Sequence, residues 1–270
     1  MEDNKKISIV TAYYNRRKLF YNTLKTIELS KYKDLVEIIA VDDASDDENR
    51  IDDFPNLFNL DIKIIRVEKK DKWWMNPCIP FNIGFKEAKG EIIIIQNPEC
   101  LHFGDIIEYI VDNIKENNYL TFGAYSIDNT NTHSINKINF DNPGFKNQIG
   151  KIITPLRNAS IISDGTNGWY NHSVYRPLML HFCSAIMKTD LDDLGGFDER
   201  YSGGIAYDDN DFLLRIKRKN MNVEIVDRPF VIHQFHGNTQ YGTKQQFVIK
   251  NESLYRSVLI NNTKNYKANQ

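Results

Sequence analysis

Three polar segments of this sequence each follow a short apolar run and carry side chains that can bind a ligand. They begin at Thr11, at Asp42-Asp43 and at Asn97-Pro98-Glu99. If the apolar runs are strands of one open α/β sheet, their carboxyl ends meet at one edge, where such sheets bind ligands. Two of the segments are acidic, which suits a divalent cation and hydrogen bonds to a base and a ribose.

The sequence lacks the glycine-rich loops that hold phosphates directly. It contains neither GxGxxG nor GxxxxGK[ST]. A hard cation with few protein ligands, completed by phosphate oxygens, is the usual way to hold a nucleotide diphosphate beside carboxylates. We therefore expect the acidic strand ends to act through a metal ion.

The elements that would position these segments follow from the periodicity of the apolar residues. Runs of four to seven residues rich in Ile and Val alternate with segments of helical spacing. Strands are predicted at 7–10, 36–41, 61–67 and 91–95, and helices at 16–30, 81–88 and 105–116. This alternation indicates an α/β sheet with right-handed crossovers.

The second half of the chain gives weaker signals. From Ser126 to Tyr175 the sequence is rich in Asn, Gly, Ser, Thr and Asp, which indicates a long functional or mobile loop. Order is predicted to resume at 178–187, with a helix at 209–217, strands at 223–226 and 229–232, and a helix at 246–259. The last ten residues are expected to fray.

Composition excludes several classes of function. The 270 residues carry a net charge of −2, so the chain has no excess of positive charge for binding nucleic acid or anionic membranes. The three cysteines are widely spaced without a CxxC pair, so we expect neither a disulfide framework nor a thiolate zinc site. The longest apolar run, Ile92–Ile95, is too short for an integral membrane segment, and the first residues lack a signal-peptide core. We expect a cytoplasmic protein.

Several motifs in order resemble a known enzyme family. ISIVTAYYNR (7–16), VDDASDD (41–47) and NIGFKEAKGEIIIIQNPE (82–99) look like the donor half of a GT-A fold glycosyltransferase of family 2. GGFDERYSGGIAYDDNDFLLRI (195–216) resembles the acceptor motif shared with galactosyltransferase-like enzymes. VIHQFH (231–236) resembles the terminal histidine segment of such enzymes. The resemblance covers residues 7 to 240.

The resemblance implies a fold and a domain organisation. We expect one α/β GT-A (Rossmann-like) domain over residues 1–240, with a mixed, mostly parallel sheet flanked by helices. Residues 1–100 would form the nucleotide-sugar donor half and 101–240 the acceptor half, followed by a helical tail at 241–270. The implied reaction transfers a sugar from a UDP-sugar to an acceptor hydroxyl, with inversion. The acceptor, whether glycan, protein or small molecule, is left open.

The resemblance also implies roles for residues of the donor half. Thr11 and Tyr13 match residues that line the base and ribose pocket. Asp43, with Asp42 beside it, matches the carboxylate that accepts a hydrogen bond from uracil N3. By position alone, the two aspartates could equally begin a helix as its cap.

A metal site is implied where Asn97-Pro98-Glu99 takes the place of a DxD motif. Because Asn97 replaces the first acid, only Glu99 brings a charge. Glu99, one histidine and two donor phosphates could hold Mn²⁺, which accepts mixed oxygen and nitrogen ligands better than Mg²⁺ does. His233 and His236 are both candidates, but they cannot point the same way if their strand continues.

Asp208 and Asp209 precede an apolar helical segment, and Asp209 matches the catalytic base of the family. Ordinary helix capping is the alternative reading. A carboxylate at a helix N-terminus has a lowered pKa and stays ionised, which suits a base that deprotonates a sugar hydroxyl. We expect Asp208 to bind the acceptor beside it.

Three tryptophans could contact the sugars. Trp73 and Trp74 precede a predicted helix and could stack on a sugar ring, although core packing is the alternative. Trp169 lies in a glycine-flanked loop that could close over the donor as a lid.

Two other functions remain open at this point: a weak or inactive nucleotide-sugar binder, and a nucleotidyltransferase.

Overall fold

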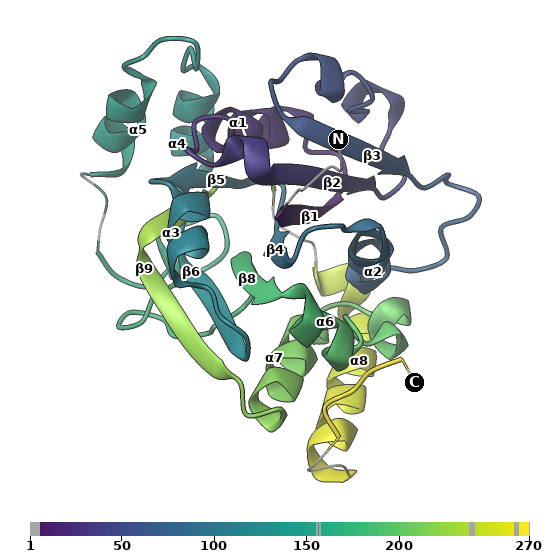
Figure 1. Ribbon diagram of the computed structural model, residues 1–270. Coiled ribbons are helices and arrows are strands. Elements are labelled where there is room, and N and C mark those ends of the chain that lie inside the picture. Colours follow the sequence, from purple (N-terminus) through teal and green to yellow (C-terminus); the bar gives the residue numbers. More distant parts are fainter. Residues whose placement is uncertain (1–5, 155, 157, 238–240, 262–264, 270) are drawn as a thin grey trace.

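A mixed β-sheet forms the centre of the molecule in the computed structural model (Figure 1). The structure describes residues 6–154, 156, 158–237, 241–261 and 265–269. Within these residues the sheet has nine strands. The strands are β1 (Ile7–Tyr13), β2 (Val36–Asp42), β3 (Asp61–Arg66), β4 (Ile92–Gln96), β5 (Cys100–Phe103), β6 (Asn118–Ser126), β7 (Gly168–Asn171), β8 (Cys183–Met187) and β9 (Asn222–His233).

The strand order is β3-β2-β1-β4-β8-β6-β9-β5, with β7 paired to β6. β1 pairs in parallel with β2 and β4, and β2 with β3, so the first half is a parallel sheet. β8 runs antiparallel to β4 and β6, whereas β9 runs parallel to β6. The carboxyl ends of β1, β2 and β4 therefore meet at one edge.

Helices cover both faces of this sheet (Figure 1). The helices are α1 (Arg17–Ile27), α2 (Cys78–Glu87), α3 (Ile106–Asn113), α4 (Asn129–Asn136), α5 (Phe145–Ile153), α6 (Lys188–Leu194), α7 (Asp208–Arg218) and α8 (Tyr241–Asn261). Short 3₁₀ turns occur at Lys33–Leu35, Asp47–Asn49, Phe54–Asn56 and Glu199–Gly203.

Two apolar clusters form the core, one on each face of the sheet. Ile9 and Tyr13 of β1 pack with α1 and α3 on one face. Val10 and Ala12 of the same strand pack with α2, α6 and α7 on the other face. Because successive side chains of a strand point to opposite faces, the two sets alternate along β1. A third cluster joins α4 and α5 to β5, β6 and β9.

The structure confirms the α/β class and the strands and helices predicted for the first hundred residues. The long loop predicted for 126–175 is wrong, because α4, α5 and β7 lie within it. The two late strands predicted at 223–226 and 229–232 are one strand, β9. The last residues were expected to fray, but the Ala268 N–H donates to the Leu194 carbonyl at 2.9 Å. Residues 262–264 and 270 of that segment lie outside the described residues.

Candidate active site

A cleft of about 650 Å³ opens at the carboxyl ends of β1, β2 and β4. Its other wall is formed by the first turn of α7 and the end of β9. Eight of the residues expected to act on a substrate or metal line it: Asp43, Trp74, Asn97, Glu99, Asp208, Asp209, His233 and His236. The sheet therefore brings together segments that are up to 193 residues apart in the sequence, from Asp43 to His236.

The end of β1 contributes Ala12 and Tyr14 to the cleft, and not the two residues expected from the resemblance. Thr11 and Tyr13 belong to the opposite face of the strand and are buried. The Tyr13 hydroxyl donates to the Asn49 carbonyl at 2.5 Å, which fixes it inside the core. The structure therefore places Ala12 and Tyr14 at the cleft, and not Thr11 and Tyr13 as expected.

The two aspartates after β2 have different environments. The buried Asp42 carboxylate accepts hydrogen bonds from Arg66 at 2.6 Å and from the Ser45 N–H at 2.9 Å. Asp42 is thus part of the scaffold, which corrects its expected role in binding the donor. Asp43 lines the cleft, where burial raises the pKa of its carboxyl group even though Lys72 opposes the shift.

Asp43 is held in place by two donors from one loop. Lys72 Nζ lies 2.7 Å from Oδ2, and Trp74 Nε1 donates to Oδ1 at 2.9 Å. Trp74 is buried, so its indole fixes a carboxylate while its ring forms part of the wall. The neighbouring Trp73 is 69% exposed and packs edge-on against Trp74.

Glu99, after β4, is buried among three groups that carry or can carry a positive charge. Its carboxylate lies 2.7 Å from Arg16 Nη1, 3.3 Å from His233 Nε2 and 3.6 Å from His236 Nε2. Burial alone would raise the pKa of Glu99, but Arg16 and the two histidines hold that pKa below its usual range. Glu99 is therefore ionised at neutral pH.

Glu99, His233 and His236 form a group that fits a metal ion, and we call it the Glu99 cluster. One ligand atom from each residue can be chosen so that all three lie within 4.8 Å of one another. Burial lowers the pKa of His236 to about 4, so its imidazole is neutral, as metal ligation requires. The His233 Nδ1 atom is buried without a hydrogen-bond partner in the described part of the chain. A carboxylate with two imidazoles is a donor set for first-row divalent metals.

The expectation that only one of the two histidines could face this site is wrong. β9 ends at His233, and the residues that follow are no longer part of a strand. The period-2 alternation of a strand no longer applies, and both rings turn toward Glu99 with centroids 5.3 Å apart.

The first turn of α7 presents two carboxylates to the cleft. Asp208 accepts a hydrogen bond from Asn76 Nδ2 at 2.8 Å, and burial together with the charge of Asp209 raises its pKa to about 6. Burial also raises the pKa of Asp209, against the hydrogen bond from the Asn210 N–H. The lowered pKa expected from the helix N-terminus is therefore wrong, because desolvation outweighs the helix dipole.

The backbone before these carboxylates is strained. Ala206 and Tyr207 have φ of 61° and 67°, a left-handed conformation that is costly for residues other than glycine. Asn251 of α8 holds this turn by donating to the Ala206 carbonyl at 2.9 Å and to the Tyr201 carbonyl at 3.0 Å. Tertiary contacts thus set the direction in which Asp208 and Asp209 point.

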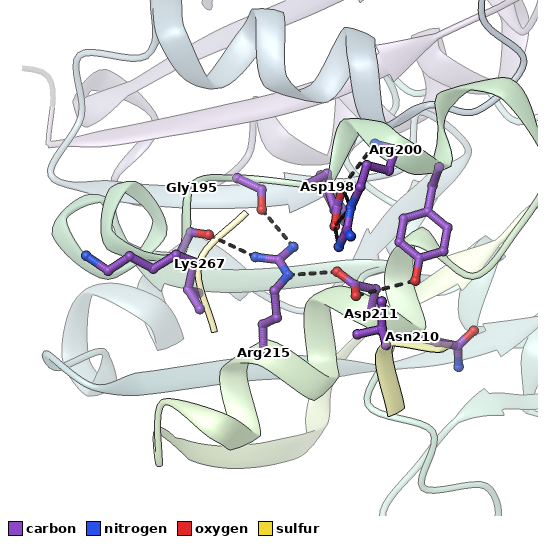
Figure 2. Close-up of polar contacts among 12 residues, drawn as sticks. Gly195, Asp198, Arg200, Asn210, Asp211, Arg215 and Lys267 are labelled. Atoms are coloured by element: carbon purple, nitrogen blue, oxygen red, sulfur yellow. Dashed lines mark hydrogen bonds and ion pairs between the residues drawn. The ribbon is translucent and has the colours of Figure 1, made fainter. Parts of the chain in front are cut away.

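A third aspartate of α7, Asp211, is not among the residues that line the cleft and points toward Arg215 (Figure 2). Its carboxylate forms a fully buried ion pair with Arg215 at 2.7 Å. The same guanidinium donates to the Leu194 and Gly196 carbonyls, each at 2.9 Å. Asp211 and Arg215 therefore fasten α7 to the segment after α6 and keep the first turn of α7 at the cleft.

A match to a family model identifies the kind of protein to which this cleft belongs. The model for glycosyl transferase family 2 matches residues 8–176. The chain belongs to glycosyl transferase family 2. The matched region contains the ends of β1, β2 and β4, while α7 and the two histidines lie beyond it.

Relatives of this family 2 member are much longer than the chain itself. It is 27% identical over 194 residues to an uncharacterized glycosyltransferase of Rickettsia conorii, covering 72% of this chain and 27% of the relative. An uncharacterized glycosyltransferase of Rickettsia felis is 27% identical over 115 residues, covering 43% of this chain and 18% of the relative.

Solved structures share its fold at low sequence identity. A mannosyltransferase of Pyrobaculum calidifontis, in complex with GDP-Man and Mn²⁺, has a TM-score of 0.54 at 14% identity, covering 92% of this chain and 63% of that one. S. aureus TarS 1–349 in complex with UDP-GlcNAc has a TM-score of 0.57 at 14% identity, covering 88% and 61%. The likeness to these glycosyltransferases confirms the expected GT-A fold. None of the described helices is both long and apolar enough to cross a membrane.

Trp169 does not line the cleft of this family 2 protein, so the lid expected at this position is wrong. It lies in β7, where its indole N–H donates to Asn158 Oδ1 at 2.7 Å and its ring packs against Tyr125 and Phe230. The next residue, Tyr170, lines the cleft instead. The sequence could not show this, since the strand is only four residues long.

Sequence reasoning missed two charged residues of the cleft that contact predicted site residues. Arg16 and Lys72 line it and contact Glu99 and Asp43. His181 also lines the cleft, where it is buried against Phe81 and Phe197. Arg16 lies at the end of the TAYYNR motif, and this position after a strand was the signal that could have revealed it.

Proposed function

We propose that this chain is a metal-dependent glycosyltransferase that transfers a sugar from a UDP-sugar to an acceptor hydroxyl. One observation carries the proposal: a single cleft holds a carboxylate that could bind the nucleobase, a cluster that fits a metal ion, and a pair of carboxylates on α7. Asp43, the Glu99 cluster and Asp208-Asp209 occupy these three places.

The nucleotide would lie at the ends of β1 and β2. Asp43 would accept the N3–H of uracil, since Lys72 and Trp74 already fix both of its oxygens in place. Tyr14 is 47% exposed and lines the same wall, so its ring can pack on a base or ribose. The complexes of similar structures with UDP-GlcNAc and with GDP-Man support a nucleotide sugar as donor.

The diphosphate would lie over the Glu99 cluster. Glu99, His233 and His236 would hold Mn²⁺, or Mg²⁺ less well, because two of the three ligands are nitrogen. Such an ion supplies positive charge that stabilises the leaving nucleoside diphosphate. Asn97 lines the cleft beside Glu99 and would offer its amide to a phosphate or sugar oxygen.

Asp209 would act as the general base. Its raised pKa makes it a stronger base than an exposed aspartate, which favours removal of a proton from a hydroxyl. The acceptor oxygen then forms a bond to the anomeric carbon, the bond from that carbon to the phosphate oxygen breaks, and Asp209 keeps the proton. Attack opposite the leaving group inverts the anomeric configuration. Asp208, held by Asn76, would position the acceptor.

The acceptor would enter past Trp73, whose exposed indole can stack on a sugar ring or another apolar face. A glycan, a protein or a small molecule could carry the accepting hydroxyl. We assign residues 1–100 to the donor half and 101–240 to the acceptor half, followed by the helical tail at 241–270. The three cysteines are free and buried, which suits a cytoplasmic location.

A nucleotide-sugar binder without catalysis is the second candidate, because Asn97 replaces an acid and Arg16 neutralises Glu99. The variant Asp209→Asn separates the two. In an enzyme it lowers the rate of transfer about 10³-fold, with little change in nucleotide affinity. If the wild-type protein transfers no sugar with any UDP-sugar and acceptor, yet binds UDP, the binder is the correct reading.

Thermal stability tests the donor site directly. We would measure melting of the purified protein with UDP, GDP, CDP and TDP, each with Mn²⁺ and with EDTA. A ligand at about 100 times its Kd stabilises the folded state by about 2.7 kcal/mol. We expect a shift for UDP that requires Mn²⁺. A shift for another nucleotide would change the donor class, and no shift with any of them would contradict the proposal.

A further inference from the structure

A second cavity, of about 960 Å³, lies away from the cleft. It is enclosed by the end of α1, by β5 with the turn that follows it, and by one side of α5. None of the residues that line it also lines the cleft. Figure 1 shows α5 at the periphery of the molecule, next to α4 and far from α2 and α7. The proposed glycosyl transfer makes no use of this cavity.

The cavity exists because α5 packs against the sheet along only part of its surface. Phe145 and Ile149 enter the apolar cluster of β5, β6 and β9. The next residue, Gly150, faces open space, since a Cβ atom placed on it would meet nothing within 4 Å. β5 is the last strand of the sheet order, so among the described residues no further strand fills the space beside it.

The walls of the cavity are apolar, and its unpaired charge is positive. Leu29, Phe103, Phe145 and Ile149 supply apolar surface. Lys146 and Lys151 of α5 also line it, and neither ammonium group has a carboxylate partner in the part of the chain that the structure describes.

The one carboxylate of the cavity is already satisfied. Asp105 caps α3 by accepting from the Glu108 N–H at 3.0 Å. It also accepts from Ser30 Oγ at 2.7 Å and from the Lys31 N–H at 2.9 Å. These three donors engage the carboxylate in local structure at the start of α3 and the end of α1, so it does not pair with either lysine in the described part of the chain.

We propose that this cavity is a binding site for an anionic amphiphile, a molecule with an aliphatic chain and a phosphate or carboxylate head group. The chain would occupy the apolar space left open at Gly150. The head group would contact Lys146 and Lys151. Pockets of this size that are mostly apolar, with a few charged groups at defined positions, are typical of small-molecule sites.

Isothermal titration calorimetry with octyl, nonyl and decyl phosphate, each kept below its micelle concentration, tests the site. We expect saturable binding of one molecule, with affinity rising about fourfold for each added methylene. Decan-1-ol, which lacks the charge, should bind at least about tenfold more weakly than decyl phosphate. No binding of any alkyl phosphate, or equal binding of the alcohol, would overturn the proposal.

Two kinds of variant locate the site. Gly150→Phe fills the open space and should lower decyl phosphate affinity by at least about tenfold, whereas Gly150→Ala should lower it by less than about threefold. Lys146→Glu with Lys151→Glu should weaken binding by about tenfold and keep the dependence on chain length. Lys217→Glu, an exposed change on α7, is the matched control and should have no effect. Unchanged affinity in Gly150→Phe or in the double lysine variant would overturn the assignment.

Discussion

Replacing Arg16 with Gln should increase the affinity of the Glu99 cluster for Mn²⁺. Arg16 Nη1 lies 2.7 Å from Glu99 Oε2, so the guanidinium competes with a metal ion for the same carboxylate. The Arg16 side chain is 29% exposed and that of Glu99 only 2%, so this ion pair is intermediate between a surface pair and a buried pair.

The size of the effect follows from this intermediate position. Surface pairs contribute up to about 1 kcal/mol, and breaking a fully buried pair costs about 3–5 kcal/mol. Solvent screening of the exposed part of Arg16 places its pair at about 2 kcal/mol. Because about 1.4 kcal/mol is a factor of ten, the variant should bind Mn²⁺ about 30-fold more tightly.

The assay is a titration of Mn²⁺ followed by electron paramagnetic resonance of the free ion, without nucleotide. Arg17→Gln is the matched control, because this neighbouring arginine pairs with Asp53 and does not line the cleft. An unchanged Kd in the Arg16 variant, or an equal gain in the Arg17 variant, would refute the competition. Loss of Mn²⁺ binding in Glu99→Gln would confirm that the same cluster is being titrated.

Three further outcomes follow from the carboxylates of α7. Asp209→Asn should lower kcat about 10³-fold with little change in the Kd for UDP, and a loss below about tenfold in steady-state assays would exclude it as the base. Activity should fall as the pH drops below about 6. Burial raises the pKa of Asp208 to about 6 and also raises the pKa of Asp209, so the pair takes up protons in this range. A fall in kcat/KM that begins only near pH 4 would contradict this. Arg215→Met should lower the free energy of unfolding in urea by about 3–5 kcal/mol by leaving the Asp211 carboxylate buried and unpaired, whereas a loss below about 1 kcal/mol would show that the pair is not needed.

The amino-acid sequence by itself determined the order of strands and helices in the first hundred residues and the edge of the sheet at which the cleft lies. Continuous Ile and Val runs are sufficient for buried parallel strands, and polar residues directly after them lie at the carboxyl edge of the sheet. Asp43 and Glu99 were found in this way, and Asp209 through the resemblance of its segment to the family motif; the structure places all three in one cleft. The pattern failed where elements were short or polar, as in α4, α5 and β7.

Only the tertiary structure decided which side chain of each segment faces the cleft. β1 is buried on both faces, so its sequence shows no alternation that would distinguish Thr11 and Tyr13 from Ala12 and Tyr14. The pairing of Arg16 with Glu99 joins residues 83 positions apart, and no local pattern encodes such a contact. The two histidines converge because β9 ends at His233, which depends on its pairing with β5 and β6. Local sequence sets the elements, whereas orientation and charge pairing depend on long-range packing.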